Sequence, residues 1–228
     1  MNTRESAIFQ ILKQSARLFR DNGFEATSVR QIAEEAGTSA SMINHYFGSK
    51  DYLGAQVLSL LASYAHSAAQ PYVSPEKDPI LYDLTMSRML FSYLFTNGYL
   101  KFYQDSLKSD FFFRFLDSKP TRLAEELSKF YSFEYTPDEA TLYCRYMPYM
   151  LEKTLILKKA EGMFTSLDYF RIPCMISTMG MSHFIPEKEI LLRDPEARQI
   201  CAQVLPSLHA LVPDSWIAEY VSQTVLPN

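Results

Sequence analysis

The side chains that could do chemistry gather between residues 27 and 50, and the chemistry they suggest is hydrogen bonding to another molecule. Short polar side chains near the start of a helix can reach the donors and acceptors on base edges while the helix N-terminus faces phosphates. Residues of this kind follow Gly37 at close spacing: Thr38, Ser39, Ser41, Asn44 and His45. Asn44 suits either adenine or a phosphate, and the spacing alone does not choose between them.

The remaining reactive side chains form no catalytic or metal-binding pattern. The three cysteines are widely spaced and odd in number, as in an intracellular protein with reduced thiols. With seven glycines, the chain has no glycine-rich loop to hold phosphate groups, and no nucleophile or zinc motif is present. We therefore expect a protein that is not an enzyme and uses no cofactor or metal. The four histidines are also scattered: His45, His66, His183 and His209.

Two short helices joined by a tight turn are predicted to position the polar side chains. Ser28 and Gln31 have the spacing of a capping box at the start of the first helix. Gly37 stands where a left-handed residue would end that helix, and Ser39 is placed to cap a second helix from Ala40 to about Tyr46. This helix–turn–helix geometry lets the second helix enter a DNA major groove. The positions predicted to face inward are Met42 or Ile43, and Phe47.

The surrounding sequence resembles the N-terminal DNA-binding domain of TetR-type transcriptional regulators. Three blocks carry the resemblance in order within residues 8 to 53: LF–x2–NGF–x2–T, IA–x2–AG–x–S and INHYFGSK. The resemblance implies a three-helix head, a helical body that binds a small-molecule effector, and a homodimer that represses transcription.

By the same resemblance, Tyr46 and Lys50 contact phosphates, and Arg30 reaches either a base or the backbone. Thr27 and Ser28 would donate to a phosphate from the start of their helix. The sequence departs from the commoner family pattern at three positions, which concern the choice of operator rather than the fold: Thr38, Ala40 and Ser41.

The charge of the chain gives little support to nucleic-acid binding. The formal net charge is −4, and the first 53 residues hold six basic and six acidic side chains. Affinity for nucleic acids depends largely on neutralising phosphates. We therefore expect few phosphate contacts and a shallow dependence of affinity on salt, with Arg4, Arg30 and Lys50 as the cations beside the motif.

Helical periodicity runs through the rest of the chain, and no alternating strand pattern interrupts it. The segment 71–79 holds three prolines and is the clearest linker. Kinks or interruptions are predicted at Pro148, Pro173 and Pro206, and the helix over 99–117 should be frayed or bent in its middle. The sequence thus predicts an all-α protein, with helices over about 4–22, 28–36, 40–46, 50–69, 80–95, 99–117, 120–131, 137–160, 166–184, 194–212 and 214–225.

We divide the chain into a helix-turn-helix head (1–49), a connecting helix (50–70) and a ligand-binding and dimerisation body (71–228). A single head buries too little surface for tight specific binding, so we expect a homodimer that reads a palindromic operator in double-stranded DNA. The resemblance places the dimer interface on the helices over 166–184 and 194–212. The alternative is that the apolar residues of these helices form an intramolecular core.

The body is rich in aromatic and methionine side chains, which line adaptable apolar pockets but also build ordinary helical cores. We expect a pocket for a small apolar or aromatic effector, with tyrosine hydroxyls as polar anchors. For a cationic effector, Glu152 is the candidate counter-charge. The candidate ligand contacts are Phe91, Phe95, Phe102, Tyr103, Tyr143, Tyr146, Met147, Met150, Met175 and Met179.

No apolar run approaches the roughly 20 residues that a membrane span needs, and the N-terminus lacks the layout of a signal peptide, so we expect a cytoplasmic protein with no membrane partner. The function that the sequence favours is a ligand-responsive DNA-binding transcriptional regulator, a repressor that an effector releases from its operator. The alternative is a helical small-molecule-binding or interaction module whose head has lost DNA binding, as the uncharged head would allow.

Overall fold

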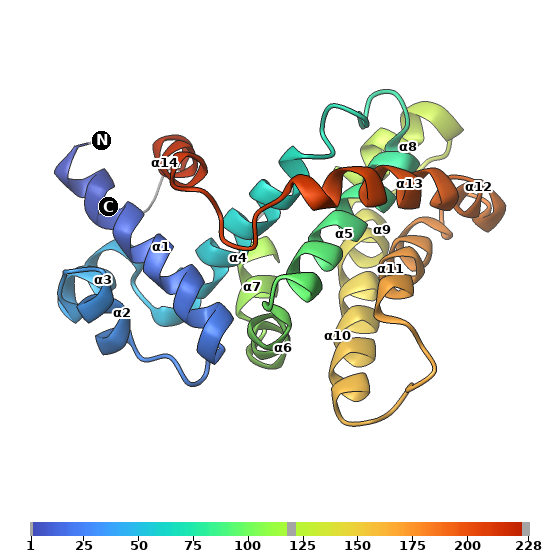
Figure 1. The fold of residues 1–228 in the computed structure, drawn as a ribbon. Helices are drawn as coiled ribbons and strands as arrows, with labels where there is room; N and C mark the ends of the chain where they lie inside the picture. Colours follow the sequence, from blue (N-terminus) through green and yellow to red (C-terminus); the bar gives the residue numbers. More distant parts are fainter. Residues whose placement is uncertain (1, 118–121, 225–228) are drawn as a thin grey trace. The chain divides into compact units, whose positions relative to one another are not determined.

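The computed structural model describes residues 2–117 and 122–224. Within these ranges the chain is helical and contains no strand, which confirms the all-α prediction (Figure 1). No helix in these ranges is both long and apolar enough to cross a lipid bilayer. The α-helices are α1 (Thr3–Asn22), α2 (Val29–Glu35), α3 (Ala40–Phe47), α4 (Lys50–Ser67), α5 (Pro79–Thr96), α6 (Leu100–Ser109), α7 (Phe111–Asp117), α8 (Leu123–Tyr131), α9 (Pro137–Thr141), α10 (Met147–Ala160), α11 (Ile172–Met181), α12 (Glu187–Leu191), α13 (Asp194–Val204) and α14 (Asp214–Gln223), with a π segment η1 (Leu142–Tyr146) and 3₁₀ turns η2 (Tyr169–Arg171) and η3 (Leu205–Ser207).

The chain forms two compact units, and their limits differ from the predicted domain boundaries. Unit 1 takes in the described residues of 1–64, 94–118 and 209–228, and unit 2 takes in those of 65–93 and 119–208. The helix-turn-helix head therefore shares a unit with α6, α7 and α14, which the sequence assigned to a separate body. The physical reason is that α6 and α14 both pack on α1 and bury apolar surface that the head alone would expose.

An aromatic cluster joins α6 and α7 to the head in unit 1. The Phe102 ring stacks on Phe19 with 4.8 Å between centroids, and the Phe24 ring lies 4.5 Å from that of Phe111. Gly54 on α4 allows this packing, since a Cβ atom there would lie 2.8 Å from the Phe24 ring and 3.0 Å from the Phe111 ring. The close approach of these rings explains a glycine in the interior of a helix.

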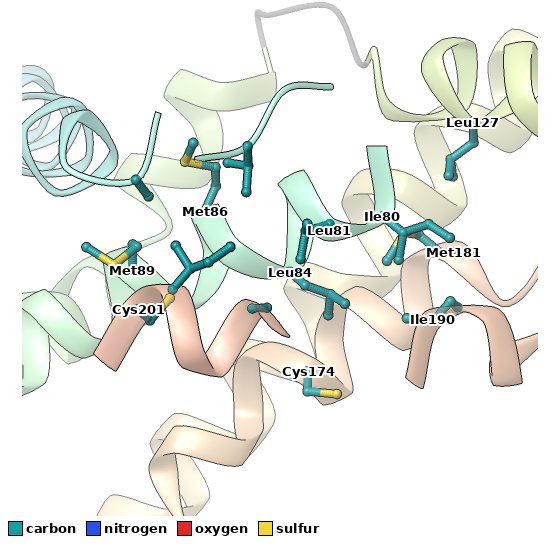
Figure 2. Close-up of a cluster of buried hydrophobic side chains, with 14 of the residues drawn as sticks. Ile80, Leu81, Leu84, Met86, Met89, Leu127, Cys174, Met181, Ile190 and Cys201 are labelled. Carbon is teal, nitrogen blue, oxygen red and sulfur yellow. The ribbon is translucent and has the colours of Figure 1, made fainter. Parts of the chain in front are cut away.

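The core of unit 2 is built mainly by α5, α11 and α13 (Figure 2). Each fully buried aliphatic or methionine side chain contributes roughly 1.5–3 kcal/mol relative to an exposed one. The helices supply side chains at the three- and four-residue spacing that the sequence shows. The labelled members of this core are Ile80, Leu81, Leu84, Met86, Met89, Leu127, Cys174, Met181, Ile190 and Cys201.

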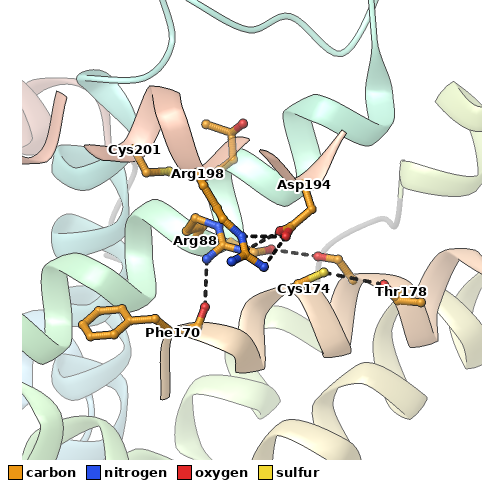
Figure 3. Close-up of polar contacts among 10 residues, drawn as sticks. Arg88, Phe170, Cys174, Thr178, Asp194, Arg198 and Cys201 are labelled. Atoms are coloured by element: carbon orange, nitrogen blue, oxygen red, sulfur yellow. Dashed lines mark hydrogen bonds and ion pairs between the residues drawn. The ribbon is translucent and has the colours of Figure 1, made fainter. Parts of the chain in front are cut away.

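A buried charge network ties α5 to α13 in unit 2 (Figure 3). The side chains of Arg88 and Asp194 are 7% and 8% exposed. The Arg88 guanidinium donates to Asp194 Oδ1 and, at 2.8 Å, to the carbonyl oxygen of Phe170. Arg198, one turn further along α13, donates to Asp194 Oδ2 at 2.6 Å. Burial alone would raise the pKa of the Asp194 carboxyl, but the two guanidinium groups hold that pKa below its usual value.

Several helix interruptions fall at or near the predicted places. Asp110, with φ of 56°, separates α6 from α7 and is the bend predicted within 99–117. Before Pro148 the helix widens into η1, because proline has no N–H with which to continue the α-helical ladder. Pro173 lies in the first turn of α11 and starts that helix instead of interrupting it. The short α12 is absent from the predicted helices, and Pro120, the predicted start of a helix, lies outside the described residues.

Candidate nucleic-acid interface

The turn between α2 and α3 is held by the caps that the sequence predicts. Ser28 Oγ accepts a hydrogen bond from the Gln31 N–H at 3.2 Å, and Gln31 Oε1 accepts one from the Ser28 N–H at 2.8 Å. Gly37 has φ of 63°, a conformation that strains residues with a Cβ atom. The Thr38 N–H donates back to the Ala33 carbonyl oxygen at 2.9 Å and closes the turn. These bonds fix the direction in which α3 leaves α2.

One side of α3 faces the core and the other faces outward. Ile43 and Phe47 are 0% and 3% exposed, whereas Asn44 and His45 are exposed. Of the two residues left open for the inward position, Ile43 takes it, and Met42 is 36% exposed. The outward side of α3 therefore carries the amide and the imidazole that were assigned to DNA contact.

The first turn of α3 adds two exposed hydroxyl groups to this side. Ser39 Oγ accepts from the Met42 N–H at 3.2 Å and lies 2.8 Å from Ser41 Oγ. Thr38, just before them, is half-buried. A mutual hydrogen bond orders the two serine hydroxyls while leaving them exposed, so both remain candidates for contact with DNA.

Thr27 is placed differently from the prediction. Its side chain is 1% exposed, and its hydroxyl donates to the carbonyl oxygens of Gly23, at 2.7 Å, and Leu18, at 3.3 Å. A hydroxyl buried in this way has no proton to offer a phosphate. Thr27 therefore ties the α1–α2 connection together, and the expected phosphate contact is corrected to a packing role. Ser28, the next residue, is exposed and keeps its place at the helix N-terminus.

The cations beside the motif are constrained to different degrees. Lys50 Nζ lies 4.1 Å from the centroid of the Phe24 ring, and burial lowers the pKa of this ammonium group. Arg17 of α1 pairs with Glu35 at the end of α2, with 2.5 Å between Nη2 and Oε2. Arg30 is exposed on α2. Tyr46 is half-buried beside the ring of His45. Among the six basic and six acidic side chains of the first 53 residues, Arg17 and Glu35 thus neutralise each other by direct contact.

The candidate effector contacts are divided between the two units. Phe95, Phe102 and Tyr103 belong to unit 1, where Phe102 and Tyr103 are buried in its aromatic core. In unit 2, the Tyr143 ring stacks on His183 with 3.5 Å between centroids and 7° between planes. Phe91 is buried in unit 2. The exposed members of the set are Tyr146, Met147, Met150, Met175 and Met179.

Met175 and Met179 line a cavity of about 590 Å³ in unit 2. The same cavity is bordered by Cys174 and Thr178 of α11 and by polar groups that the sequence analysis did not select. Asp194 and Arg198 are four residues apart on one helix, a spacing that favours an ion pair. This spacing could have identified the charged pair at the edge of the cavity. The polar and charged residues that line it are Arg171, Cys174, Thr178, Ser182, Glu187, Asp194 and Arg198.

Glu152, the candidate counter-charge, lies on α10 in unit 2. Its Oε1 is fully buried and has no hydrogen-bond partner among the described residues, although the residue as a whole keeps partial exposure. Burial raises the pKa of this carboxyl to about 8. A carboxyl group placed in this way would gain from a ligand that supplies a donor or a positive charge.

Known proteins resemble part of this chain. Residues 11–57 match the family described as bacterial regulatory proteins, tetR family. A curated relative, the HTH-type transcriptional repressor KstR2 of Mycolicibacterium smegmatis, is 30% identical over 71 residues. That match covers 31% of this chain and 35% of the relative, so the chain corresponds to about a third of the relative's length.

Solved structures give more distant matches over most of the chain. A TetR-family regulator from Streptomyces coelicolor is 18% identical, with 95% of this chain and 96% of that chain covered and a TM-score of 0.40. The ketosteroid transcriptional regulator KstR2 of Mycobacterium tuberculosis is 19% identical, with coverage of 91% and 95% and a TM-score of 0.35.

Proposed function

We propose that this chain, a TetR-type regulator by its N-terminal domain, is a transcriptional repressor that binds a palindromic operator as a homodimer in the cytoplasm and is released by a small-molecule effector. The observation that carries the DNA-binding part is the outward side of α3. Asn44 and His45 are exposed there, on a helix whose opposite side is anchored by Ile43 and Phe47. A rigid helix with polar groups on its free side is what readout in the major groove requires.

Dimerisation follows from the size of this surface. One short helix contacts too few base pairs for specific binding, and two copies related by a two-fold axis would read two half-sites about one DNA turn, roughly 34–36 Å, apart. The helices proposed for the interface are α11 and α13, which lie within the predicted ranges 166–184 and 194–212.

The effector is proposed to bind unit 2 and to be apolar or aromatic. The cavity that Met175 and Met179 line supports a ligand with apolar surface. The unpartnered Oε1 of Glu152, which does not line this cavity, marks a separate position in unit 2 where a hydrogen-bond donor would be accepted. Such a ligand weakens operator binding only by its difference in affinity between the two states of the protein. The aromatic residues of unit 1 are proposed to serve packing, because Phe102 is 0% exposed.

The experiment that tests this function is footprinting on the DNA upstream of the gene for this chain, together with selection of binding sites from random duplexes. We expect protection of a near-palindrome at low salt and a complex that contains two chains. Asn44→Ala should weaken the selected complex, whereas Ser128→Ala, which removes an exposed hydroxyl from α8, should not. Protection of no site at low salt, with Asn44→Ala and wild type alike, would defeat the proposal.

The alternative function, an interaction or small-molecule-binding module without DNA binding, is favoured by the absence of net charge in the first 53 residues. Phosphate neutralisation supplies most non-specific affinity for DNA, so such a module would not be retained on heparin at low salt. Retention that is lost in the Lys50→Met variant would exclude this alternative. Passage of the wild type through the heparin column without retention would support this alternative.

A further inference from the structure

We propose that α14 is a detachable clamp on the DNA-binding head and that its docking sets the affinity of the head for DNA. The inference rests on the proposed function, because it concerns the control of DNA binding. In Figure 1, α14 lies beside α1, and both helices belong to unit 1. A helix from the C-terminal end of the chain is thus part of the unit that holds the helix-turn-helix.

Polar contacts to α1 of the head and to α4 hold α14 in place. On α1, Lys13 Nζ lies 2.7 Å from Asp214 Oδ2. On α4, the buried Gln56 accepts a hydrogen bond from the Tyr220 hydroxyl at 3.0 Å through its Oε1. These bonds fix both the start and the end of α14. Its buried apolar side is formed by Ile217 and Val221, at 2% and 6% exposure.

The docking site of α14 is directly connected to the helix-turn-helix through α1. Arg17 follows Lys13 by one helical turn and pairs with Glu35 at the end of α2. These three side chains and Asp214 border one cavity of about 540 Å³. One turn of α1 therefore carries both the contact to α14 and the contact to α2. Loss of α14 would free this side of α1 and loosen the support of α2, and with it the direction of α3.

Beside the buried Ile217 and Val221, the contact between α14 and the head includes a cavity and exposed polar groups. The cavity of about 540 Å³ lies along this contact, so part of the α14 surface there borders open space and not protein side chains. The Lys13 and Asp214 side chains are 38% and 59% exposed, and exposed ion pairs stabilise little. Trp216 Nε1 is buried and finds no acceptor among the described residues, a cost that undocking would remove. We therefore expect α14 to exchange between a docked and a released state.

The chain also gives α14 a route to the effector-binding unit. After α13, which belongs to unit 2, only the segment Leu205–Pro213 precedes α14. The clamp and α13 are therefore close neighbours along the chain. A rearrangement of α13 would act on α14 through this segment, independently of α4.

Trp216 makes docking measurable, because it is the only tryptophan of the chain and its ring lies 5.8 Å from that of Tyr64. Ile217→Asn places a polar group in the buried side and should release α14. Ser215→Ala, at an exposed position of the same helix, is the matched control. We expect Ile217→Asn to increase acrylamide quenching of Trp216 and to weaken binding of the selected duplex by about tenfold or more, with the control unchanged.

A second measurement uses the unaltered chain, so it does not depend on the folding of a variant. Because DNA should select the docked state, saturating duplex should protect Trp216 from acrylamide. Quenching that is unchanged by DNA, or an Ile217→Asn chain that exposes Trp216 yet binds DNA within about twofold of wild type, would overturn the clamp. DNA binding by the wild-type and control chains in the same assay shows that the proposed function holds even where the clamp fails.

Discussion

The ammonium nitrogen of Lys50 lies 4.1 Å from the centroid of the Phe24 ring, at the residue where α4 begins. The ring belongs to the aromatic core of unit 1, so a cation expected to touch DNA is also positioned by packing. The negative face of the ring favours the charged ammonium, while partial burial lowers the pKa of Lys50. A cation held in one place loses less conformational entropy when it meets a phosphate.

Replacing Lys50 tests whether this cation contacts a phosphate. In the Lys50→Met variant we expect weaker binding to all duplexes alike and a decrease of about one in the slope of log affinity against log salt. Fluorescence anisotropy titrations over a range of salt concentrations measure both quantities. Lys77→Met, at an exposed position of the linker, is the control and should leave the slope unchanged. An unaltered slope for Lys50→Met would place the phosphate contact elsewhere.

Thr27→Val tests the packing role that replaces the predicted phosphate contact. Valine keeps the shape of the side chain but leaves the Gly23 carbonyl oxygen without this donor, so we expect a loss of about 1–3 kcal/mol in the free energy of unfolding. Thr27→Ser retains the hydroxyl and should recover most of that loss. Urea unfolding measures the stability, and the salt slope of DNA binding should not change. A lower slope with unchanged stability would restore the phosphate contact.

Loss of one member of the Arg88–Asp194 pair should lower the free energy of unfolding far more than loss of both members. Asp194→Ala leaves the Arg88 guanidinium buried and uncompensated, which costs about 3–5 kcal/mol. The double variant Arg88→Met, Asp194→Leu removes both charges and should be close to wild type in stability. Thermal unfolding of the single variants Arg88→Met and Asp194→Leu and of the double variant gives the coupling between the two residues. Simple additivity would show that the network contributes nothing as a unit.

Stability should depend on pH through Glu152 and His66 in unit 2. Burial raises the pKa of Glu152 from 4.5 to about 8 and lowers the pKa of His66 from 6.5 to about 4. The folded chain therefore keeps a proton on Glu152 that the unfolded chain loses above its own pKa, so this contribution to stability declines as pH rises towards 8. Buried neutral His66 acts in the opposite direction, since its contribution grows between pH 4 and 6.5.

Above pH 6.5, Glu152 is the one of these two residues whose ionisation still changes the free energy of unfolding. The free energy of unfolding should then fall with rising pH up to about 8, by at most about 1.4 kcal/mol per pH unit. Glu152→Gln should flatten this decline, and His66→Gln should not. Urea unfolding at a series of pH values between 4 and 9 gives both curves. Parallel curves for wild type and Glu152→Gln would show that this carboxyl ionises as an ordinary exposed glutamate.

Local rules were enough to predict the helix-turn-helix. The bonds of Ser28 with Gln31 and the positive φ of Gly37 depend on residues within a few positions of one another, so their types determine the local geometry. The outward position of Asn44 follows from the burial of Ile43 and Phe47, which helical spacing also determines. The roles proposed for the outward side chains remain predictions.

The tertiary contacts could not be predicted from such local rules. Thr27 looks like a helix-start residue in sequence, but the carbonyl oxygens of Leu18 and Gly23 lie close enough to take its hydroxyl into the core. The placing of α14 on α1 depends on Lys13 meeting Asp214, residues at opposite ends of the chain, and no local pattern links them. The sequence also could not separate core residues from cavity residues, because Phe102 in the core and Met175 at the cavity are both apolar.

The central claim is that the outward side of α3 reads the bases of an operator, and competition binding with single-base-pair variants of the selected duplex tests it most directly. For the wild type, each changed pair in the contacted half-site should cost about 1–3 kcal/mol. Asn44→Ala should lose that discrimination at one pair in each half-site while keeping its affinity for non-specific DNA. Identical discrimination by Asn44→Ala and wild type at every position would contradict readout by this residue, and a wild type that distinguishes no base pair would contradict the account as a whole.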